Sequence, residues 1–290
     1  MNITLALGGG GAKGNSHIGV IRRLEREGFK IDAVAGTSFG GLVAVFYALG
    51  YTPAQIEDQF VALDQTRLYG FAPKDGPSLL GFAGATKWLN ETIGDKTFDD
   101  LQIPCVVTAT DLKYGCEVIL SKGSLVDALL ATMAVPGIFP SRNMGEWELV
   151  DGSVLDPVPV APVRALRPNL PVIAVVLSTP MGVPAQTWYL PVPEYLPRQL
   201  VERITKLRYA LALDIFSRSL DMAGRAITEY RLEVDKPEII LRPQVTDIEI
   251  LDRVDVRAVV KKGEEVVEAA LPEIKNLFAW QNRLRRVIGV

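Results

Sequence analysis

Two short segments near the start of the chain combine residue types that could do chemistry. Residues 36–40 read Gly-Thr-Ser-Phe-Gly, so Ser38 lies between two glycines, after one apolar run and before another. A G-x-S-x-G sequence at a strand-to-helix turn is typical of a nucleophilic serine, because the sharp turn exposes the hydroxyl. The same position also suits a serine that merely caps a helix. The partners of Ser38 must decide between these two interpretations.

Residues 8–14 form a second glycine-rich segment, Gly-Gly-Gly-Gly-Ala-Lys-Gly. Glycines before a helix let backbone N–H groups converge on a developing negative charge. Three of these glycines also match the G-x-G-x-x-G pattern of dinucleotide sites. That site needs an acidic residue at the end of the second strand, whereas Asp32 lies at its beginning and the Ser38 turn follows its end. An oxyanion loop is therefore favoured, with a plain tight turn and a dinucleotide site as alternatives.

A nucleophilic serine also needs a base within hydrogen-bond reach. The chain contains one histidine, His17, which we expect to bond to nearby backbone, although a Ser-His pair stays open. Asp151 is the leading carboxylate, because it ends an apparent strand and precedes a glycine turn. Asp111 and Asp156 are alternatives for which turn or capping chemistry is the simpler expectation. An aspartate is a weak base, so a Ser-Asp pair needs strong oxyanion stabilisation.

Alternating strand and helix patterns must position these segments. We predict strands at 2–8, 31–37, 104–111, 116–120, 146–153, 171–178 and 237–243. Helices are predicted at 14–27, 38–50, 53–64 and 124–134, with a long helical stretch over 196–233, broken near Gly224, and another over 254–286. Residues 65–97 are read as loops with one short helix, and the proline-rich segment 181–197 as a surface loop or cover. This order predicts a three-layer α/β/α fold with a mainly parallel central sheet, as one domain over 1–290 with a helical C-terminal portion from about 196.

Composition narrows the class of protein. A net charge of −3 argues against nucleic acid as a partner. No apolar run reaches the roughly eighteen residues of a transmembrane helix, and no signal peptide is seen, so we expect a cytoplasmic protein. Cys105 and Cys116 flank an expected hairpin and could pair, but the lack of a signal peptide favours buried free thiols. One histidine and two cysteines argue against a structural zinc site.

Taken together, the motifs resemble those of the patatin-like phospholipases, over most of residues 3–160. The segment GGGGAKGNSHIGV looks like the glycine-rich loop and first helix of that family, and GTSFGG looks like its nucleophile turn. Residues 131–140, ATMAVPGIFP, look like the loop ahead of its third motif. Asp-Gly-Ser at 151–153 stands where the family carries Asp-Gly-Gly or Asp-Gly-Ala.

The resemblance implies a patatin-like fold and a Ser-Asp dyad without a catalytic histidine. Ser38 is then the nucleophile and Asp151 the proton acceptor, in an acyl-serine mechanism that needs no cofactor and no metal. The substrate is a lipid ester, reached by transient peripheral contact with a membrane surface. The expected oxyanion or substrate-binding residues are Gly9, Gly10, Gly11 and Lys13, of which Lys13 orders the loop or attracts an anionic head group.

Two positions depart from the family pattern. Ser153 adds a hydroxyl beside the expected base, and Asp156 stands where the resemblance leads us to expect asparagine. A second carboxylate close to Asp151 would raise its proton affinity by like-charge repulsion. A different class of function also stays open, that of a lipid-binding or regulatory protein with the same fold and little turnover, with 196–233 as a partner surface.

Overall fold

The computed structural model describes residues 1–65, 68–71, 76–183 and 208–279. Within these residues, eight strands form one sheet in the order β5-β6-β3-β2-β1-β7-β8, and β4 also pairs with β3. The strands are β1 Asn2–Leu7, β2 Lys30–Thr37, β3 Cys105–Asp111, β4 Cys116–Leu120, β5 Arg142–Met144, β6 Trp147–Asp151, β7 Val172–Val175 and β8 Ile239–Leu241.

The centre of the sheet is parallel and one side is antiparallel. Strands β3, β2, β1, β7 and β8 run parallel to one another, whereas β4 and β6 run antiparallel to β3, and β5 antiparallel to β6. The predicted mainly parallel α/β/α fold is confirmed.

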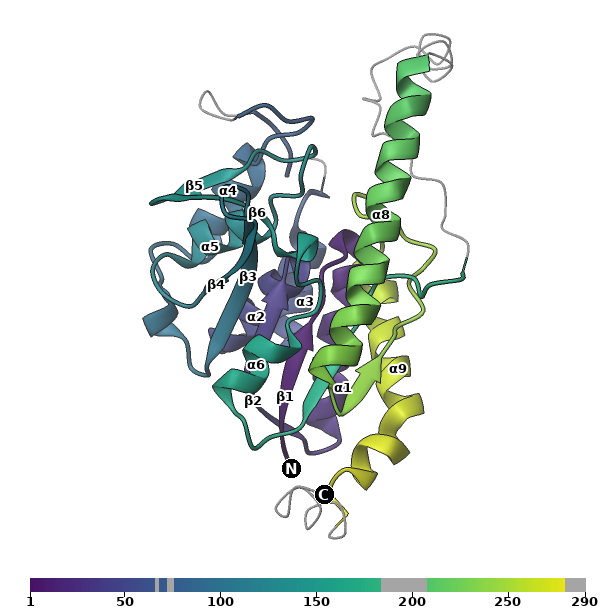
Figure 1. The fold of residues 1–290 in the computed structure, drawn as a ribbon. Helices are drawn as coiled ribbons and strands as arrows, with labels where there is room; N and C mark the ends of the chain where they lie inside the picture. Colours follow the sequence, from purple (N-terminus) through teal and green to yellow (C-terminus); the bar gives the residue numbers. More distant parts are fainter. Residues whose placement is uncertain (66–67, 72–75, 184–207, 280–290) are drawn as a thin grey trace.

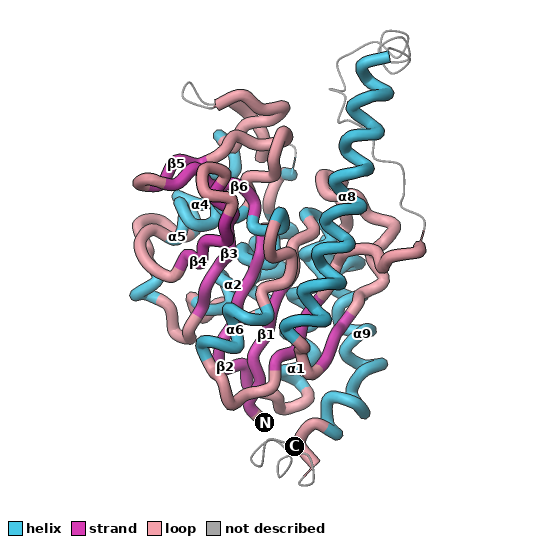
Figure 2. Tube along the Cα trace, viewed as in Figure 1, coloured by secondary structure: helices cyan, strands magenta, loops and turns pink. Residues whose placement is uncertain are grey.

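Helices cover both faces of the sheet (Figures 1 and 2). One layer contains α1 Ser16–Arg26, α2 Phe39–Ala48, α3 Pro53–Ala62, α4 Ala83–Thr92, α5 Leu125–Thr132 and α9 Val256–Asn276. The other layer contains α6 Val160–Leu166 and the long α8 Arg208–Asp235, whose first part extends beyond the sheet in Figure 1.

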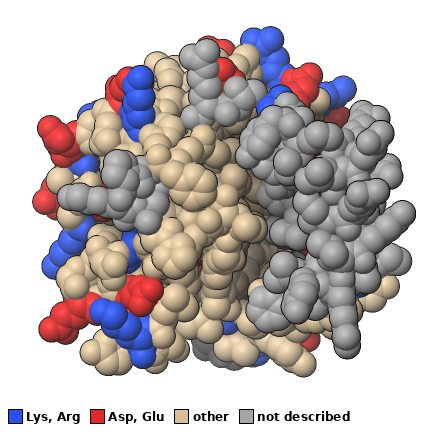
Figure 3. All heavy atoms as spheres, turned by 90° about the horizontal axis from the view of Figure 1, so that it is seen from above, with Lys and Arg blue, Asp and Glu red and all other residues tan. Residues whose placement is uncertain are grey.

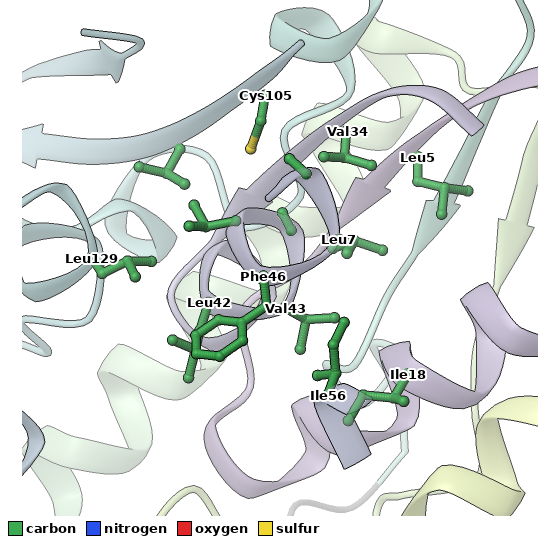
Figure 4. Close-up of a cluster of buried hydrophobic side chains, with 14 of the residues drawn as sticks. Leu5, Leu7, Ile18, Val34, Leu42, Val43, Phe46, Ile56, Cys105 and Leu129 are labelled. Carbon is green, nitrogen blue, oxygen red and sulfur yellow. The ribbon is translucent and has the colours of Figure 1, made fainter. Parts of the chain in front are cut away.

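Large and small side chains alternate along the central strands, so the larger ones face one helical layer and the smaller ones face the other. In β1, Leu5 and Leu7 point to the α1–α2 side, whereas Ala6 points to the α6 side. Figure 4 shows Leu5, Leu7 and other side chains of the larger cluster around the apolar helix α2. The small residues on the other face let α6 pack closely against β1 and β2, and α8 packs against α6.

Several predicted elements differ from the observed ones. Helix α8 continues past Gly224 without a break, while residues 196–207 of the predicted stretch, most of the proline-rich segment and residues 280–286 lie outside the described residues. The short elements β5 and α6 were not predicted, because each has too few residues for a periodic pattern. Both cysteines are free and Cys105 is buried, but the expectation of a buried Cys116 is wrong: it opens β4 and is exposed.

Candidate active site

Ser38 lies on the tight turn between β2 and α2. Its φ of 54° is one that a residue with a side chain rarely adopts and that costs about 1–3 kcal/mol. The turn is possible because Gly36 and Gly40 lack side chains: a Cβ on Gly36 would meet the backbone of Gly40, and one on Gly40 would meet the carbonyl of Leu7. Ser38 occupies the N-cap position of α2, but its hydroxyl makes no capping hydrogen bond. The backbone geometry is therefore that of a nucleophile turn, and the hydroxyl is left for another partner.

That partner is the buried carboxyl of Asp151, at the end of β6. Asp151 is 2% exposed, and its Oδ1 accepts a hydrogen bond of 2.8 Å from the N–H of Ser153. Burial raises the pKa of Asp151, and hydrogen bonds from the side chain of Ser38 and from the amide and hydroxyl of Ser153 offset part of this rise. A carboxylate of raised pKa accepts a proton more readily than an exposed aspartate does.

The register of three neighbouring strands brings the two residues together. Thr37, which precedes Ser38, pairs with Thr108 of β3, and the next residue of β3 pairs with Asp151. The hydroxyls of Thr37 and Thr108 are hydrogen-bonded at 2.7 Å. Gly152 allows the chain to turn here, because a Cβ on it would lie 2.5 Å from the carbonyl oxygen of Thr108. Backbone pairing of β2 with β3 and of β3 with β6 thus brings the Ser38 turn close to Asp151, although the two are far apart in the sequence.

The glycine loop follows β1 and lies against Ser38. A Cβ on Gly9 would meet the hydroxyl of Ser153 and lie 3.2 Å from Cβ of Ser38. The N–H of Gly9 donates to the carbonyl of Pro157 at 3.0 Å, so it is already paired. No acceptor is seen for the amides of Gly10 and Gly11 within the described part of the chain. Of the three expected oxyanion donors, Gly10 and Gly11 are thus available, while Gly9 provides space.

Lys13 is not among the residues that line the cavity described below, although Gly11 and Ala12 are. Its surroundings on the α8 side include the acidic residues Glu249, Asp221 and Asp252, together with Arg225. Burial lowers the pKa of Lys13, and the acidic neighbours offset part of that change. Both roles considered for Lys13, ordering of the loop and attraction of an anionic head group, stay predictions.

His17 is buried in α1 and bonds to the backbone, as expected. Its Nε2 lies 2.8 Å from the carbonyl oxygen of Gly8, and its Nδ1 has no partner among the described residues. Burial lowers the pKa of His17 to about 4, although the bond to Gly8 acts in the opposite direction. A neutral ring that donates from Nε2 to Gly8 holds the start of the glycine loop and is not bonded to Ser38.

The two alternative carboxylates have other partners. Burial alone would raise the pKa of Asp111, but hydrogen bonds from the backbone N–H groups of Lys113, Tyr114 and Glu148 bring it below its ordinary value. Asp156 forms an ion pair with Arg231 of α8 instead of acting on Asp151, whose shift is explained by burial and by the hydrogen bonds from Ser38 and Ser153.

Ser38 opens into a cavity of about 680 Å³ with a mainly apolar lining. The wall comes from residues 11–15, α2, α3, α4, the segments 68–71, 79–82 and 133–139, and residues 250–256. Its aromatic side chains are Phe39, Phe60, Tyr69, Phe71, Phe82, Trp88 and Phe139. Sequence reasoning missed these residues, although the concentration of aromatics in 65–97 was a signal. Figure 3 shows that the described surface on this side is largely uncharged, with Lys, Arg, Asp and Glu gathered toward its margins.

Neither a membrane span nor a metal cluster is found in the ranges that the structure describes. No described helix combines the length and the apolar character needed to cross a bilayer. No group of three or more His, Cys, Asp and Glu side chains in those ranges is arranged to hold a metal ion.

The chain is similar to proteins of one known family. A family model described as Patatin-like phospholipase matches residues 5–164. An uncharacterized NTE family protein of Mycobacterium tuberculosis is 34% identical over 187 residues, which are 63% of this chain and 51% of that protein. The Lysophospholipase NTE1 of Saccharomyces cerevisiae is 29% identical over 180 residues, which are 56% of this chain and 10% of that protein.

The fold also has a solved counterpart. The crystal structure of VipD from Legionella pneumophila superposes with a TM-score of 0.55 at 14% identity, covering 93% of this chain and 66% of that one. This likeness concerns the fold alone. The chain spans about half the length, or less, of the curated relatives that it matches.

Proposed function

The chain belongs to the patatin-like phospholipase family, and from this premise we propose that it is a serine acyl hydrolase of lipid carboxylic esters. The observation that carries the proposal is the pairing of a strained, uncapped Ser38 with the buried Asp151 at the wall of an apolar cavity. Strain at a non-glycine residue persists only where the surrounding structure enforces it, and it is concentrated at functional sites.

In the proposed reaction, Ser38 Oγ attacks the ester carbonyl while Asp151 takes its proton. The oxyanion of the tetrahedral intermediate is stabilised by the amides of Gly10 and Gly11, where each donor contributes about 2.7–4 kcal/mol. The alcohol leaves with the proton from Asp151, and an acyl-serine remains. Water then gives its proton to Asp151 and attacks the acyl carbon. The bond to Ser38 Oγ breaks, the fatty acid leaves, and Asp151 returns the proton to Oγ, which restores Ser38. The Ser153 N–H holds Asp151 in place throughout.

The cavity supports a lipid as the substrate. Its lining is mostly aliphatic and aromatic, and such a surface binds an acyl chain through burial of apolar area at about 25 cal/mol per Å². The name of the yeast relative, a lysophospholipase, points to the same class of ester. Phe71 and Leu79, which line the cavity and are 62% and 52% exposed, are suited to transient contact with a membrane surface. We further propose that residues 1–290 act as one acyl hydrolase domain.

The alternative is a protein of the same fold that binds lipid without turnover. The cavity suits this function equally, but simple binding gives no reason for the strained backbone of Ser38 or for the carboxyl group bonded to it. The two functions separate in one experiment, because a binding protein retains lipid unchanged whereas a hydrolase releases fatty acid.

The experiment is fluorophosphonate labelling combined with product analysis on vesicles of mixed phospholipids and lysophospholipids. Wild type is expected to be labelled once, at Ser38, and to release fatty acid, whereas Ser38→Ala does neither. Asp151→Asn is expected to lose about 10²–10⁴ in rate, the usual range for a general base. Wild type that is not labelled at Ser38, or that binds lipid without turnover, contradicts the proposal.

Ser124→Ala is the matched control. Ser124 caps α5, and its hydroxyl accepts a hydrogen bond of 3.2 Å from the N–H of Asp127. Its removal is expected to cost about 1 kcal/mol of stability while leaving labelling intact. The contrast separates a capping serine from the serine that we assign as the nucleophile.

A further inference from the structure

Asp156 lies five residues after Asp151, on the same turn, and is completely buried. Family resemblance leads us to expect an asparagine here, so the chain has placed a carboxyl group where a neutral amide would stand. A buried carboxylate is costly unless a partner of opposite charge compensates it. The partner of Asp156 comes from a distant part of the chain, the last third of α8.

Arg231 is that partner, and it faces several acids. Its Nη2 lies 3.0 Å from Asp156 Oδ2 and 3.2 Å from Glu117 Oε2 of β4. Its Nε lies 3.4 Å from Asp235 Oδ2, one turn further along α8. One guanidinium thus serves three carboxyl groups from three elements: the turn after β6, strand β4 and helix α8.

This cluster has an excess of negative charge, and one proton relieves it. Burial and, after it, the negative charge of Glu117 raise the pKa of Asp156, whereas Arg231 lowers it, and the net result is a pKa of about 7. Two close carboxylates do not both ionise readily, so a proton on Asp156 relieves its repulsion by Glu117 near neutral pH. Glu117 Oε1 and Asp156 Oδ1, both buried, have no hydrogen-bond donor among the described residues, which leaves room for that proton.

The turn that carries Asp156 also holds the three parts of the candidate site. The Asp156 N–H donates to the carbonyl of Gly152 at 2.8 Å, which closes the turn behind Asp151. The Thr37 hydroxyl donates to the Asp156 carbonyl at 2.9 Å, directly before the Ser38 turn. The Pro157 carbonyl accepts the Gly9 N–H at 3.0 Å. Residues 152–157 therefore directly follow Asp151 in the chain and are hydrogen-bonded both to the residue before the Ser38 turn and to the glycine loop.

We propose that Arg231 is a positioning residue: by its ion pair with Asp156 it fixes the turn 152–157 and so sets the geometry of Ser38, Asp151 and the glycine loop. The proposal rests on the function proposed above. Under this proposal the active site is formed only when α8 has packed in place, although α8 supplies no group that reacts with the substrate.

The test compares Arg231→Met with Arg231→Lys and with the control Arg242→Met. Arg242 also anchors α8, through bonds of 2.8 and 2.9 Å to the two carboxylate oxygens of Glu229, and its side chain is 27% exposed against 30% for Arg231. It has no bond to the turn 152–157. The measurements are thermal unfolding, the rate of fluorophosphonate labelling, and kcat and KM on a water-soluble short-chain ester.

Arg231→Met is expected to lower the labelling rate and kcat by about ten- to a hundredfold with KM nearly unchanged, since small displacements of reacting groups have effects of this size. Arg231→Lys is expected to recover part of the loss. Arg242→Met is expected to reduce thermal stability while its kcat stays within about twofold of wild type. Equal loss of kcat in Arg231→Met and Arg242→Met, or unchanged kcat in a folded Arg231→Met, overturns the proposal.

Asp156→Asn gives a second, independent readout. In wild type the labelling rate is expected to change with pH near 7, where Asp156 titrates among Glu117, Arg231 and Asp235. Asp156→Asn is expected to remove this change and, combined with Arg231→Met, to recover much of the lost rate. An unchanged pH profile in Asp156→Asn overturns the proposal even if Arg231→Met fails to fold.

Hydrogen exchange separates this proposal from the proposed function. If wild type is not labelled at Ser38, the function fails, but Arg231→Met is still expected to speed amide exchange in residues 8–14 and 151–157 relative to Arg242→Met. Equal exchange in the two variants overturns the positioning role without reference to any reaction.

Discussion

Gly9 and Ser153 face each other so closely that no side chain fits between them. A Cβ built on Gly9 would meet the Ser153 hydroxyl and would lie 3.2 Å from Cβ of Ser38. The Ser153 hydroxyl in turn bonds to the carboxyl of Asp151. The glycine loop, the candidate nucleophile and the candidate base therefore touch through one contact, and enlarging any of them displaces the others.

Gly9→Ala is expected to abolish most of the labelling of Ser38. The added methyl group must displace Ser153 or Ser38, and a shift of about 1 Å at reacting groups can lower a rate by about a hundredfold. Labelling rate and thermal midpoint are measured together. The control is Gly224→Ala in α8, where a Cβ meets nothing within 4 Å and where alanine is expected to stabilise by about 0.5–1 kcal/mol. Normal labelling of Gly9→Ala would contradict the close contact.

Ser153→Ala is expected to move the acidic limb of the pH–rate profile to higher pH. Its hydroxyl is one of the bonds that lower the pKa of Asp151 against the effect of burial, so its removal raises that pKa. Only the ionised carboxylate accepts a proton from Ser38, and the variant therefore loses activity at low pH and regains it at high pH. The profile of labelling rate against pH measures this. An unchanged profile would mean that the hydroxyl faces away from Asp151.

Asp151→Asn is expected to inactivate the protein and, at neutral and alkaline pH, to make its folded state more stable. Because burial raises the pKa of Asp151, its contribution to stability is present below the unfolded pKa and is lost as pH rises through the folded pKa. An amide has no such loss, so the gain over wild type grows with pH. Urea unfolding at several pH values tests this. A variant that is less stable than wild type at every pH would refute it.

His17→Gln is expected to leave labelling at neutral pH within a fewfold of wild type, because Gln can still donate to Gly8. In wild type, the pKa of His17 is lowered to about 4 in the folded chain, so its stability contribution is present above the unfolded pKa and lost as pH falls through about 4. The loss amounts to about 3 kcal/mol. The variant is expected to lack this acid sensitivity in denaturant unfolding. A folded variant that is not labelled would revive the Ser-His alternative.

Ala85→Leu is expected to shorten the acyl chain that the enzyme prefers. Ala85 is a small residue of α4 that lines the cavity, and three added carbons reduce its volume without disturbing the helix. The ratio of kcat/KM for long- and short-chain esters is expected to fall by about tenfold, as one or two methylenes of lost fit would produce. Labelling with a small fluorophosphonate serves as the control. An unchanged ratio would place the acyl chain elsewhere.

The sequence by itself determined the local features of the site. Glycines around Ser38 and in residues 8–14 can be read as turns because few other residues allow such backbone geometry and close approach. Alternating apolar patterns identified most strands and helices, and hence the α/β/α class. The near absence of histidine turned attention to carboxylates, and the motif order indicated Asp151 among them.

Only the tertiary structure decided which of these groups meet. Periodicity reports which face of an element is apolar but not which strand edges pair, so the contact of Ser38 with Asp151 depends on the register of β2, β3 and β6. The backbone pairing of Gly9, the aromatic cavity and the partner of Asp156 were likewise unpredictable. A buried carboxyl group takes its charge state from whatever approaches it in space, and Arg231, 75 positions along the chain (231 − 156), approaches Asp156 only once α8 has packed.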